Sequence, residues 1–180
     1  MTRRMFLWMM AAAGFVLRSG GSTLSAQDVQ YARAMDRAQK DRPSRLGANA
    51  RIAPTSEPGD PVIVRGRLRN VDGAAAAGTI VFAYQTDRGG LYDDRSRGPH
   101  SWRLRGWART DRDGRFTFET IRPGAYPGGS IPPHFHFTAF LPNGERYHTP
   151  QINLAATRLG NARGPEEVTA ELRLEARSRF

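Results

Sequence analysis

The chain begins with one stretch of helical spacing and continues as a series of strand-like segments. Over residues 28–41, apolar residues recur three apart, which predicts a helix, at Val29, Ala32, Met35 and Ala38. Arg42-Pro43 ends it, because the residue before a proline is disfavoured in a helix. A loop rich in Pro, Ser and Gly follows through Asp60, and we expect it to be a linker or a strap across the domain.

From Pro61 the pattern changes to short apolar or alternating runs. The predicted strands cover residues 62–68, 79–84, 103–110, 115–120 and 134–140, and a last strand in which Val168, Ala170, Leu172 and Leu174 alternate. Turn signals lie at residues 70–73, at 142–144 and at Asp111-Arg112-Asp113-Gly114, which predicts a hairpin. The expected fold is all-β: a β-sandwich of mostly antiparallel strands with a short N-terminal helix.

Length and composition agree with one turn-rich domain. The chain has 180 residues, with Gly 19, Pro 12 and no Cys. That length suits a single core. The absence of cysteine excludes disulfides, zinc–cysteine sites and thiol nucleophiles.

The first residues read as a targeting signal. Arg3 and Arg4 form a twin-arginine pattern, an apolar stretch runs from Met5 to Leu17, and a small-residue segment ends at Ala26. The stretch is short for a membrane span, although a retained anchor is the alternative. We therefore expect a signal peptide at 1–26, a helix and linker at 27–59 and a catalytic sandwich at 60–180. The protein is expected in the periplasm or secreted, with no stable membrane association once the signal is removed.

The net charge of +10 permits binding to anionic partners. However, the arginines are scattered, with no basic run and no nucleic-acid motif, so we expect no nucleic-acid partner. Attraction of anionic aromatic substrates, or solubility alone, explains the charge as well.

The sharpest local feature is Pro132-Pro133-His134-Phe135-His136-Phe137. In a strand, residues two apart point to the same face, so His134 and His136 present two imidazoles side by side. Such a pair is half of a metal site. Taken alone, the pattern is a weak signal and favours two partly exposed strand histidines.

Other motifs add to this pair in order along the chain. They are Gly90-Leu91-Tyr92, then Gly106 to Gly114 with its Trp-Ala-Arg-Thr-Asp run, then Pro123-Gly124-Ala125-Tyr126-Pro127, and finally Thr149-Pro150-Gln151-Ile152. Together with the histidine pair, they resemble the catalytic domain of the intradiol ring-cleavage dioxygenases, from about Asp60 to Ile152. The resemblance implies an enzyme that opens a catechol-type ring between its two hydroxylated carbons with O2, giving a muconate-type diacid.

The resemblance also implies a cofactor and its ligands. One non-haem Fe(III) per chain would be held by Tyr92, Tyr126, His134 and His136, with Tyr126 and His136 axial. Phenolates are hard anionic donors that suit ferric iron, and a bound cation favours loss of the phenol proton. The axial tyrosine, Tyr126, would leave when the catecholate binds. Gln151 matches a family glutamine that lies near the substrate, where an amide can stabilise developing negative charge. Homo-oligomers are common among such enzymes.

The chain departs from the family at Ile131, where relatives have an arginine that stabilises negative charge on the substrate. Arg103, Arg105 and Arg122 are candidates to replace it. The short Gly-rich segment after Tyr126 suggests an open site and a bulky catechol. Tyr84, where relatives usually have Trp, is expected to be structural, and Tyr147 and His148 are expected at the surface or the pocket rim.

Two other classes remain open. The turn and strand pattern also resembles transthyretin-like and carboxypeptidase-regulatory-like sandwich modules, which bind or space without chemistry and do not require Tyr92 or the histidine pair. A cupin-type metalloenzyme is the third class, but Glu145 and His148 are poorly placed for its ligand set.

Overall fold

The structure, a computed structural model, describes residues 26–92, 101–129, 131–155, 164–176 and 179. Its one helix is α1 (Ala26–Lys40). The strands are β1 (Asn49–Arg51), β2 (Pro61–Arg69), β3 (Ile80–Gln85), β4 (Leu104–Arg109), β5 (Arg115–Ile121), β6 (His134–Phe140), β7 (Arg146–His148), β8 (Ile152–Asn153) and β9 (Glu166–Arg173). The expected signal segment lies outside the described residues, apart from Ala26. No helix in the described ranges is long and apolar enough to cross a membrane.

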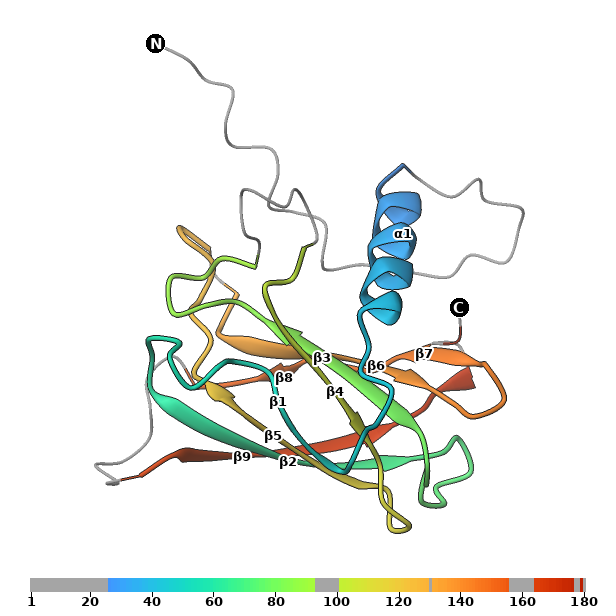
Figure 1. Ribbon diagram of the computed structural model, residues 1–180. Coiled ribbons are helices and arrows are strands. Elements are labelled where there is room, and N and C mark those ends of the chain that lie inside the picture. Colours follow the sequence, from blue (N-terminus) through green and yellow to red (C-terminus); the bar gives the residue numbers. More distant parts are fainter. Residues whose placement is uncertain (1–25, 93–100, 130, 156–163, 177–178, 180) are drawn as a thin grey trace.

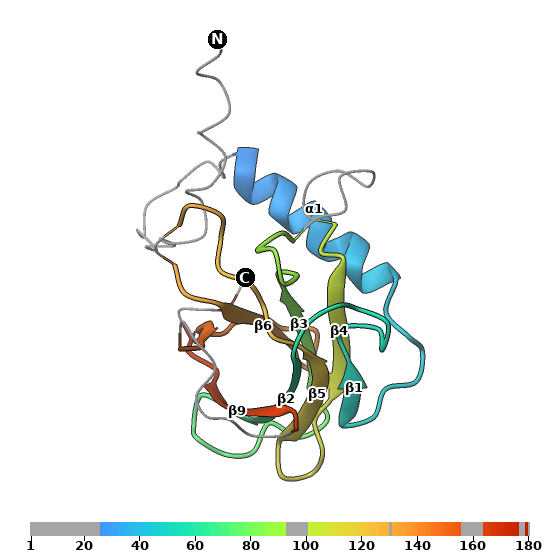
Figure 2. The same ribbon diagram turned by 90° about the vertical axis from the view of Figure 1, so that its left-hand side faces the viewer.

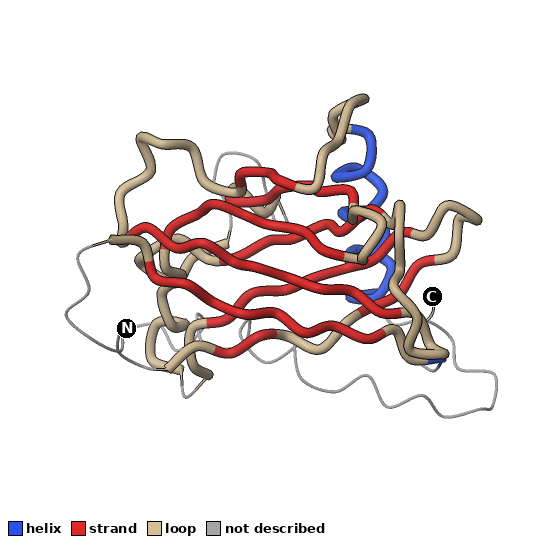
Figure 3. The backbone as a smooth tube through the Cα atoms, turned by 90° about the horizontal axis from the view of Figure 1, so that it is seen from below, coloured by secondary structure: helices blue, strands red, loops and turns tan. Residues whose placement is uncertain are grey.

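The strands form two sheets that pack face to face (Figures 1 and 2). One has the order β1-β5-β2-β9, and the other has the order β4-β3-β6-β7, with β8 also paired to β6. The β2–β9 and β1–β5 pairs are parallel and the remaining pairs are antiparallel. Seen from below, the strands run nearly along one direction (Figure 3). The predicted all-β sandwich with mostly antiparallel strands and one short helix is therefore confirmed.

The core between the sheets follows from alternation along the strands. In β2, Val62, Val64 and Leu68 point inward while Arg65 is exposed. Gly66 belongs to the inward set because the Phe116 ring lies so close that a Cβ there would be 2.0 Å from it. Phe135 and Phe137 of β6 enter the same core, so their neighbours His134 and His136 point outward.

A second, smaller core lies on the outer face of the β4-β3-β6-β7 sheet. Helix α1 covers this face (Figure 2), and its Ala34, Met35 and Ala38 pack against Phe82. Since β3 is covered on both faces, all six of its residues are buried, which explains its continuous apolar run. The helix predicted from the apolar spacing forms, but Ala32 is exposed, because a spacing of three drifts off a helix face of period 3.6.

The predicted hairpin at residues 111–114 was wrong. The turn forms, with Asp111 Oδ1 accepting the N–H groups of Asp113 and Arg115 at 2.9 Å and 2.8 Å. However, β4 pairs with β3 and β5 pairs with β2, so the turn crosses from one sheet to the other. Turn chemistry fixes where the chain reverses, whereas the burial of the flanking side chains fixes which strands pair.

The segment expected to be a linker or strap joins both sheets. The Gly47 carbonyl accepts the Arg109 N–H of β4 at 2.8 Å, and the Ala48 carbonyl accepts the Thr117 N–H of β5 at 2.7 Å. Ile52 and Ala53 are buried in the main core. The segment therefore acts as a strap and includes the short strand β1.

Candidate metal centre

The two histidines of β6 lie on the outer face of their sheet, because Phe135 and Phe137 at the alternate positions face the core. His134 is buried and His136 is half-buried. The His134 Nδ1–H donates to the Pro132 carbonyl at 2.8 Å, which leaves the Nε2 lone pair directed into the site. The strand geometry thus presents two ring nitrogens side by side, as the His-x-His spacing predicts.

The two tyrosines come from loops that follow β3 and β5. The Asp87 carbonyl accepts the N–H groups of both Gly90 and Gly124, at 3.0 Å and 2.8 Å, and so ties the loops together. The backbones of the two loops approach so closely that neither glycine leaves room for a side chain. A Cβ on Gly90, which has a φ of +81°, would lie 2.0 Å from the Ala125 carbonyl oxygen. A Cβ on Gly124 would lie 2.5 Å from the Arg88 carbonyl oxygen. This packing brings Tyr92 and Tyr126 to the same place.

The buried side-chain amide of Gln85 supports these loops through hydrogen bonds. The Gln85 side chain donates to the Ile121 carbonyl at 2.9 Å and accepts from the Thr120 hydroxyl at 2.6 Å. Thr86 Oγ1 donates to the Gly124 carbonyl at 2.7 Å. Because these groups are buried, breaking one bond leaves its partner unsatisfied, so the network holds the two loops in register.

The four predicted ligand atoms converge. Tyr92 Oη lies 2.6 Å from Tyr126 Oη, 3.0 Å from His134 Nε2 and 2.8 Å from His136 Nε2. His134 Nε2 lies 3.1 Å from Tyr126 Oη and 2.9 Å from His136 Nε2. Among the described contacts, the one pair of these atoms without a hydrogen bond is Tyr126 Oη with His136 Nε2.

Burial shapes the electrostatics of this cluster. It lowers the pKa of His136 to about 3, with the charges of His134 and His148 as further causes. It also lowers the pKa of His134 against the opposing hydrogen bond to Pro132. Both imidazoles are therefore neutral at neutral pH and have a lone pair to donate. Burial raises the pKa of Tyr126, so its phenol stays protonated unless a cation lies beside it.

The chemistry of the donor set fits a hard trivalent cation. Across the residues that the structure describes, no three His, Cys, Asp or Glu side chains gather into a metal site. The converging donors are two imidazoles and two phenols, and a ferric ion accepts both types. An ion with the charge of Fe(III) would compensate the two phenolates that it creates.

The remaining predicted site residue, Gln151, lies beside the cluster. Asn153 of β8 pairs with His134 of β6, so its side chain shares the face of the two imidazoles. Gln151 Nε2 donates to Asn153 Oδ1 at 2.8 Å, which places both amides on that side. Asn153 was missed by the sequence reasoning, since only the register of the short strand β8 shows its position.

Among the described hydrogen bonds, none joins the side chain of the three arginines proposed to replace the one absent at Ile131 to the four donor atoms. Each is bound to acidic or carbonyl groups elsewhere: Arg103 to Glu57 and Asp87, Arg105 to Asp41, Ser101 and Trp102, and Arg122 to Glu166 and Ala155. In the described part of the chain, the contacts of these three arginines therefore stabilise the fold.

Three further ring-bearing residues have more specific positions than expected. Tyr84, expected to be structural, stacks on His136. His148 is half-buried with its ring 5.6 Å from that of Tyr31. Tyr147 was expected at the surface or pocket rim, but it is buried in the core between the sheets, because alternation along β7 turns it away from His148.

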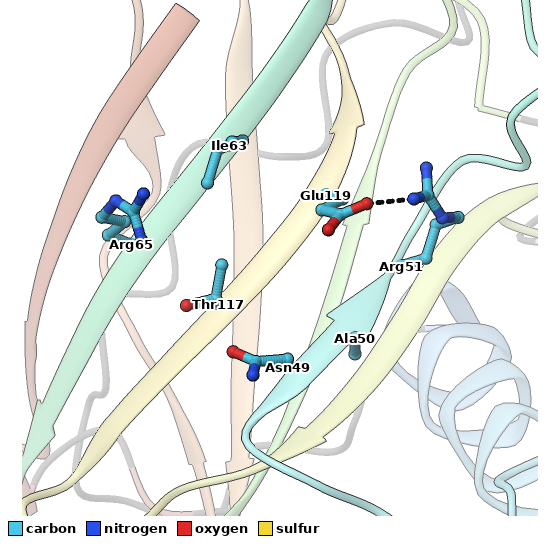
Figure 4. Close-up of a pocket in the computed structure, with 7 residues that line it drawn as sticks. All are labelled: Asn49, Ala50, Arg51, Ile63, Arg65, Thr117 and Glu119. Carbon is cyan, nitrogen blue, oxygen red and sulfur yellow. Dashed lines mark hydrogen bonds and ion pairs between the residues drawn. The ribbon is translucent and has the colours of Figure 1, made fainter. Parts of the chain in front are cut away.

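A surface hollow on the opposite side of the sandwich has no comparable chemistry. It lies on the outer face of the β1-β5-β2-β9 sheet (Figure 4), lined by Asn49, Ala50, Arg51, Ile63, Arg65, Thr117 and Glu119. The two arginines there are paired with Glu119 and Glu167. The candidate site is therefore the cluster of imidazoles and phenols.

Comparison with known proteins places the chain among dioxygenases. A family model described as "Dioxygenase" matches residues 39–159. The chain is 42% identical over 69 residues to a 6-chlorohydroxyquinol 1,2-dioxygenase of Cupriavidus pinatubonensis, covering 38% of this chain and 25% of that protein. It is 35% identical over 92 residues to a protocatechuate 3,4-dioxygenase beta chain of Burkholderia cepacia, covering 46% of this chain and 39% of that one. The chain thus spans less than half the length of these relatives.

The fold also matches a solved structure over most of its length. The dioxygenase domain of a dioxygenase–carbohydrate-binding fusion from Streptomyces sp. SirexAA-E superimposes with a TM-score of 0.56 at 26% identity. The match covers 74% of this chain and 91% of that domain.

Proposed function

Because this chain belongs to the intradiol ring-cleavage dioxygenase family, we propose that it is an Fe(III)-dependent enzyme that opens a catechol-type ring with O2. Cleavage falls between the two hydroxylated carbons and gives a muconate-type diacid. The observation that carries the proposal is the convergence of two phenol oxygens and two imidazole nitrogens, with the five hydrogen-bonded pairs 2.6–3.1 Å apart. A sandwich module without chemistry has no need of this cluster.

Tyr92, Tyr126, His134 and His136 hold the metal in this proposal. When bound, ferric iron supplies the Lewis acidity that draws electron density from a coordinated catecholate. The imidazoles contribute neutral lone pairs, since burial keeps the pKa of each low. The Pro132 carbonyl fixes which nitrogen of His134 is free.

Tyr126 has a second role as a proton acceptor. It is half-buried on a loop whose next residues, Pro127 to Gly129, are exposed. The Tyr126 carbonyl accepts the Gly129 N–H at 2.9 Å within this exposed turn, whereas the Tyr92 carbonyl accepts the Arg103 N–H at 2.8 Å, which links Tyr92 to the residue before β4. Tyr126 is therefore the phenol that is free to swing away, and its released oxygen takes a proton from an incoming catechol hydroxyl. Burial raises the pKa of this phenol, which favours the protonated, displaced form.

Gln151 is placed to stabilise charge on the substrate. Its side-chain nitrogen donates to Asn153, which fixes the amide on the imidazole face of the sheet. A second N–H of the same amide remains for an oxyanion that develops on the substrate.

The substrate class is a catechol, and the exposed approach favours a bulky one. Leu91, next to Tyr92, is 44% exposed, and the segment after Tyr126 is also exposed. The named relatives act on 6-chlorohydroxyquinol and protocatechuate, so these compounds belong in a test panel with catechol and larger diols. Fast turnover of small catechols with loss of turnover on enlarged ones would contradict the preference for bulk.

The test combines colour with oxygen uptake. Iron-loaded protein is expected to show a broad visible band from phenolate-to-iron charge transfer and to consume O2 with a catechol from the panel. Tyr126→Phe is expected to shift that band and to lower turnover at least about 100-fold, since it removes one ligand and the proton acceptor. A colourless iron-loaded protein, or a variant with an unchanged band, would remove the basis of the assignment.

Export by the twin-arginine route is proposed on the sequence alone. Fusion of the first 26 residues to a folded reporter is expected to move it out of the cytoplasm, and replacing Arg3 and Arg4 by Lys is expected to stop this. Transport that persists in the Lys variant would contradict the proposed route.

A further inference from the structure

His134 and His136 are oriented in different ways. His134 has an anchor outside the cluster, the hydrogen bond from Nδ1 to the Pro132 carbonyl. In the described part of the chain, the hydrogen bonds of His136 all run through Nε2, to the other members of the cluster. An imidazole held only at its metal-binding atom is free to turn about its Cβ–Cγ bond, so its ring plane must be set by packing.

Tyr84 supplies that packing. It is the direct cross-strand partner of His136, on β3 next to β6. The two rings are stacked, with centroids 4.7 Å apart and planes within 13°. The Tyr84 side chain is itself buried, at 7% exposure, so the stack is shielded from water.

Tyr84 is in turn held on its other side. Its ring stacks on Trp102, with centroids 4.6 Å apart and planes 25° from parallel. Trp102 is buried and has a φ of +39°, a backbone conformation uncommon for a residue other than glycine. The imidazole, the phenol and the indole thus form one column from the cluster toward the helix.

Helix α1 closes this column. The hydroxyl of Tyr84 forms a hydrogen bond with Tyr31 of α1. The Tyr31 ring also meets Trp102 edge-on, with centroids 5.5 Å apart. Residues 26–38 of α1 precede the segment matched by the family model, which begins at residue 39.

We infer that Tyr84 is a positioning residue for His136, and that helix α1 holds Tyr84 in place through Tyr31. The stack sets the plane of the imidazole and directs Nε2 at the metal. The hydrogen bond between the Tyr84 and Tyr31 hydroxyls fixes the phenol that makes the stack. The inference rests on the proposed function only for the identity of the metal, because the stack exists within the polypeptide itself.

The experiment uses four variants and one control in the full chain. Tyr84→Leu removes the stack, Tyr84→Trp keeps a flat ring, and Tyr84→Phe keeps the ring without the hydroxyl. Tyr31→Phe keeps the Tyr31 ring and removes the hydroxyl that bonds to Tyr84. Trp107→Phe is the control, because Trp107 packs on Phe82 in the same aromatic cluster, 5.1 Å between centroids, and makes no described contact with the four donors.

Two readouts separate positioning from general stability. In metal-free protein, the ring protons of His136 are expected upfield in NMR spectra because they lie over the Tyr84 ring, and Tyr84→Leu should remove this shift. In iron-loaded protein, Tyr84→Leu is expected to weaken ferric binding about 10-fold or more and to broaden the charge-transfer band. Tyr84→Trp should restore both, and Tyr84→Phe and Tyr31→Phe should show smaller losses.

The control is expected to lose thermal stability without changing either readout. The inference would be overturned if Tyr84→Leu left iron binding and the charge-transfer band unchanged. It would also be overturned if Trp107→Phe reduced both to the same extent as Tyr84→Leu. If wild-type protein bound no ferric iron, the proposed function would fail, while the NMR comparison would still decide whether Tyr84 fixes the His136 ring. If Tyr84→Leu does not fold, the Phe and Trp variants carry the comparison.

Discussion

Some functional side chains of this protein could be predicted from a local sequence pattern, whereas others could be identified only from the fold. His134 and His136 could be predicted from their spacing, since residues two apart share a strand face. Tyr92 and Tyr126 lie 34 residues apart on separate loops, and only the family resemblance connected them before the structure brought their oxygens to 2.6 Å. Tyr84 and Tyr31 were beyond prediction, because their roles depend on cross-strand register and on the docking of α1.

Gln151 provides a residue-scale test of the catalytic assignment. Gln151→Ala is expected to lower turnover about 10- to 100-fold, because it removes a donor for charge that develops on the substrate. Iron content and the visible band should stay as in wild type, since Gln151 is not among the four donors. Steady-state oxygen uptake measures the loss, and a parallel loss of iron would show a structural role instead.

Glu57 provides a test of how the Tyr92 loop is supported. Its carboxylate binds Arg103 with two contacts, at 2.6 Å and 2.8 Å, and the Arg103 N–H is bound to the Tyr92 carbonyl. The hydrogen bonds from Arg103 lower the pKa of Glu57. The group thus contributes stability that is present above the ordinary carboxyl pKa and is lost as pH falls through the lowered folded-state pKa.

Glu57→Gln is therefore expected to lower the free energy of unfolding by about 1 kcal/mol at pH 7. The difference from wild type should shrink at acidic pH, as the pH falls through the lowered pKa of Glu57 and the wild-type carboxyl is protonated as well. Urea unfolding at pH 7 and at acidic pH measures it. Glu167→Gln is the matched control, because its partner Arg65 is exposed and its effect should be smaller. Equal losses at both pH values would contradict the charge-based account.

At the scale of elements, long strands were easier to predict than short ones. β6 was placed with its observed bounds, the bounds of β2, β3 and β4 differed by one residue at each end, and β5 differed by one residue at its last position. β1, β7 and β8 were missed, since each has only two or three residues and is defined by its partner strand. The hairpin assigned to residues 111–114 failed for a related reason, because pairing depends on distant strands.

The contact between the two tyrosine loops gives an element-scale prediction. Gly90→Ala is expected to destabilise the protein and to reduce ferric binding, because its Cβ would meet the Ala125 carbonyl and force Tyr92 and Tyr126 apart. Gly128→Ala is the control, since Gly128 has a similar φ of +69° and no atom within 4 Å of an added Cβ.

The control isolates the backbone cost of about 1 kcal/mol for a side chain at positive φ. Gly90→Ala should cost about 2 kcal/mol more, in the range of an overpacked site. Denaturant unfolding and ferric titration measure the two effects. Equal results for both variants would show that the loop contact does not position the tyrosines.

For the whole molecule, the metal is expected to stabilise a fold that exists without it. The main core lies between the sheets, apart from the four donors, so metal-free protein should keep its β-sheet circular dichroism. Ferric iron, or redox-inert Ga(III), should raise the melting temperature. At 100 times the dissociation constant, the gain of about 2.7 kcal/mol corresponds to about 5–10 °C for a chain of this length. A shift that persists in Tyr92→Phe/Tyr126→Phe would indicate binding elsewhere.

The two faces of β6 have a consequence for how the sequence can vary. Phe135 and Phe137 pack in the core between the sheets, whereas His134 and His136, at the alternate positions, belong to the candidate metal centre. Under selection for abundance alone, the aromatic positions should be intolerant of replacement and the histidine positions permissive. Under selection for turnover, both sets should become intolerant. New specificities can therefore arise on the helix-covered side without redesign of the interior.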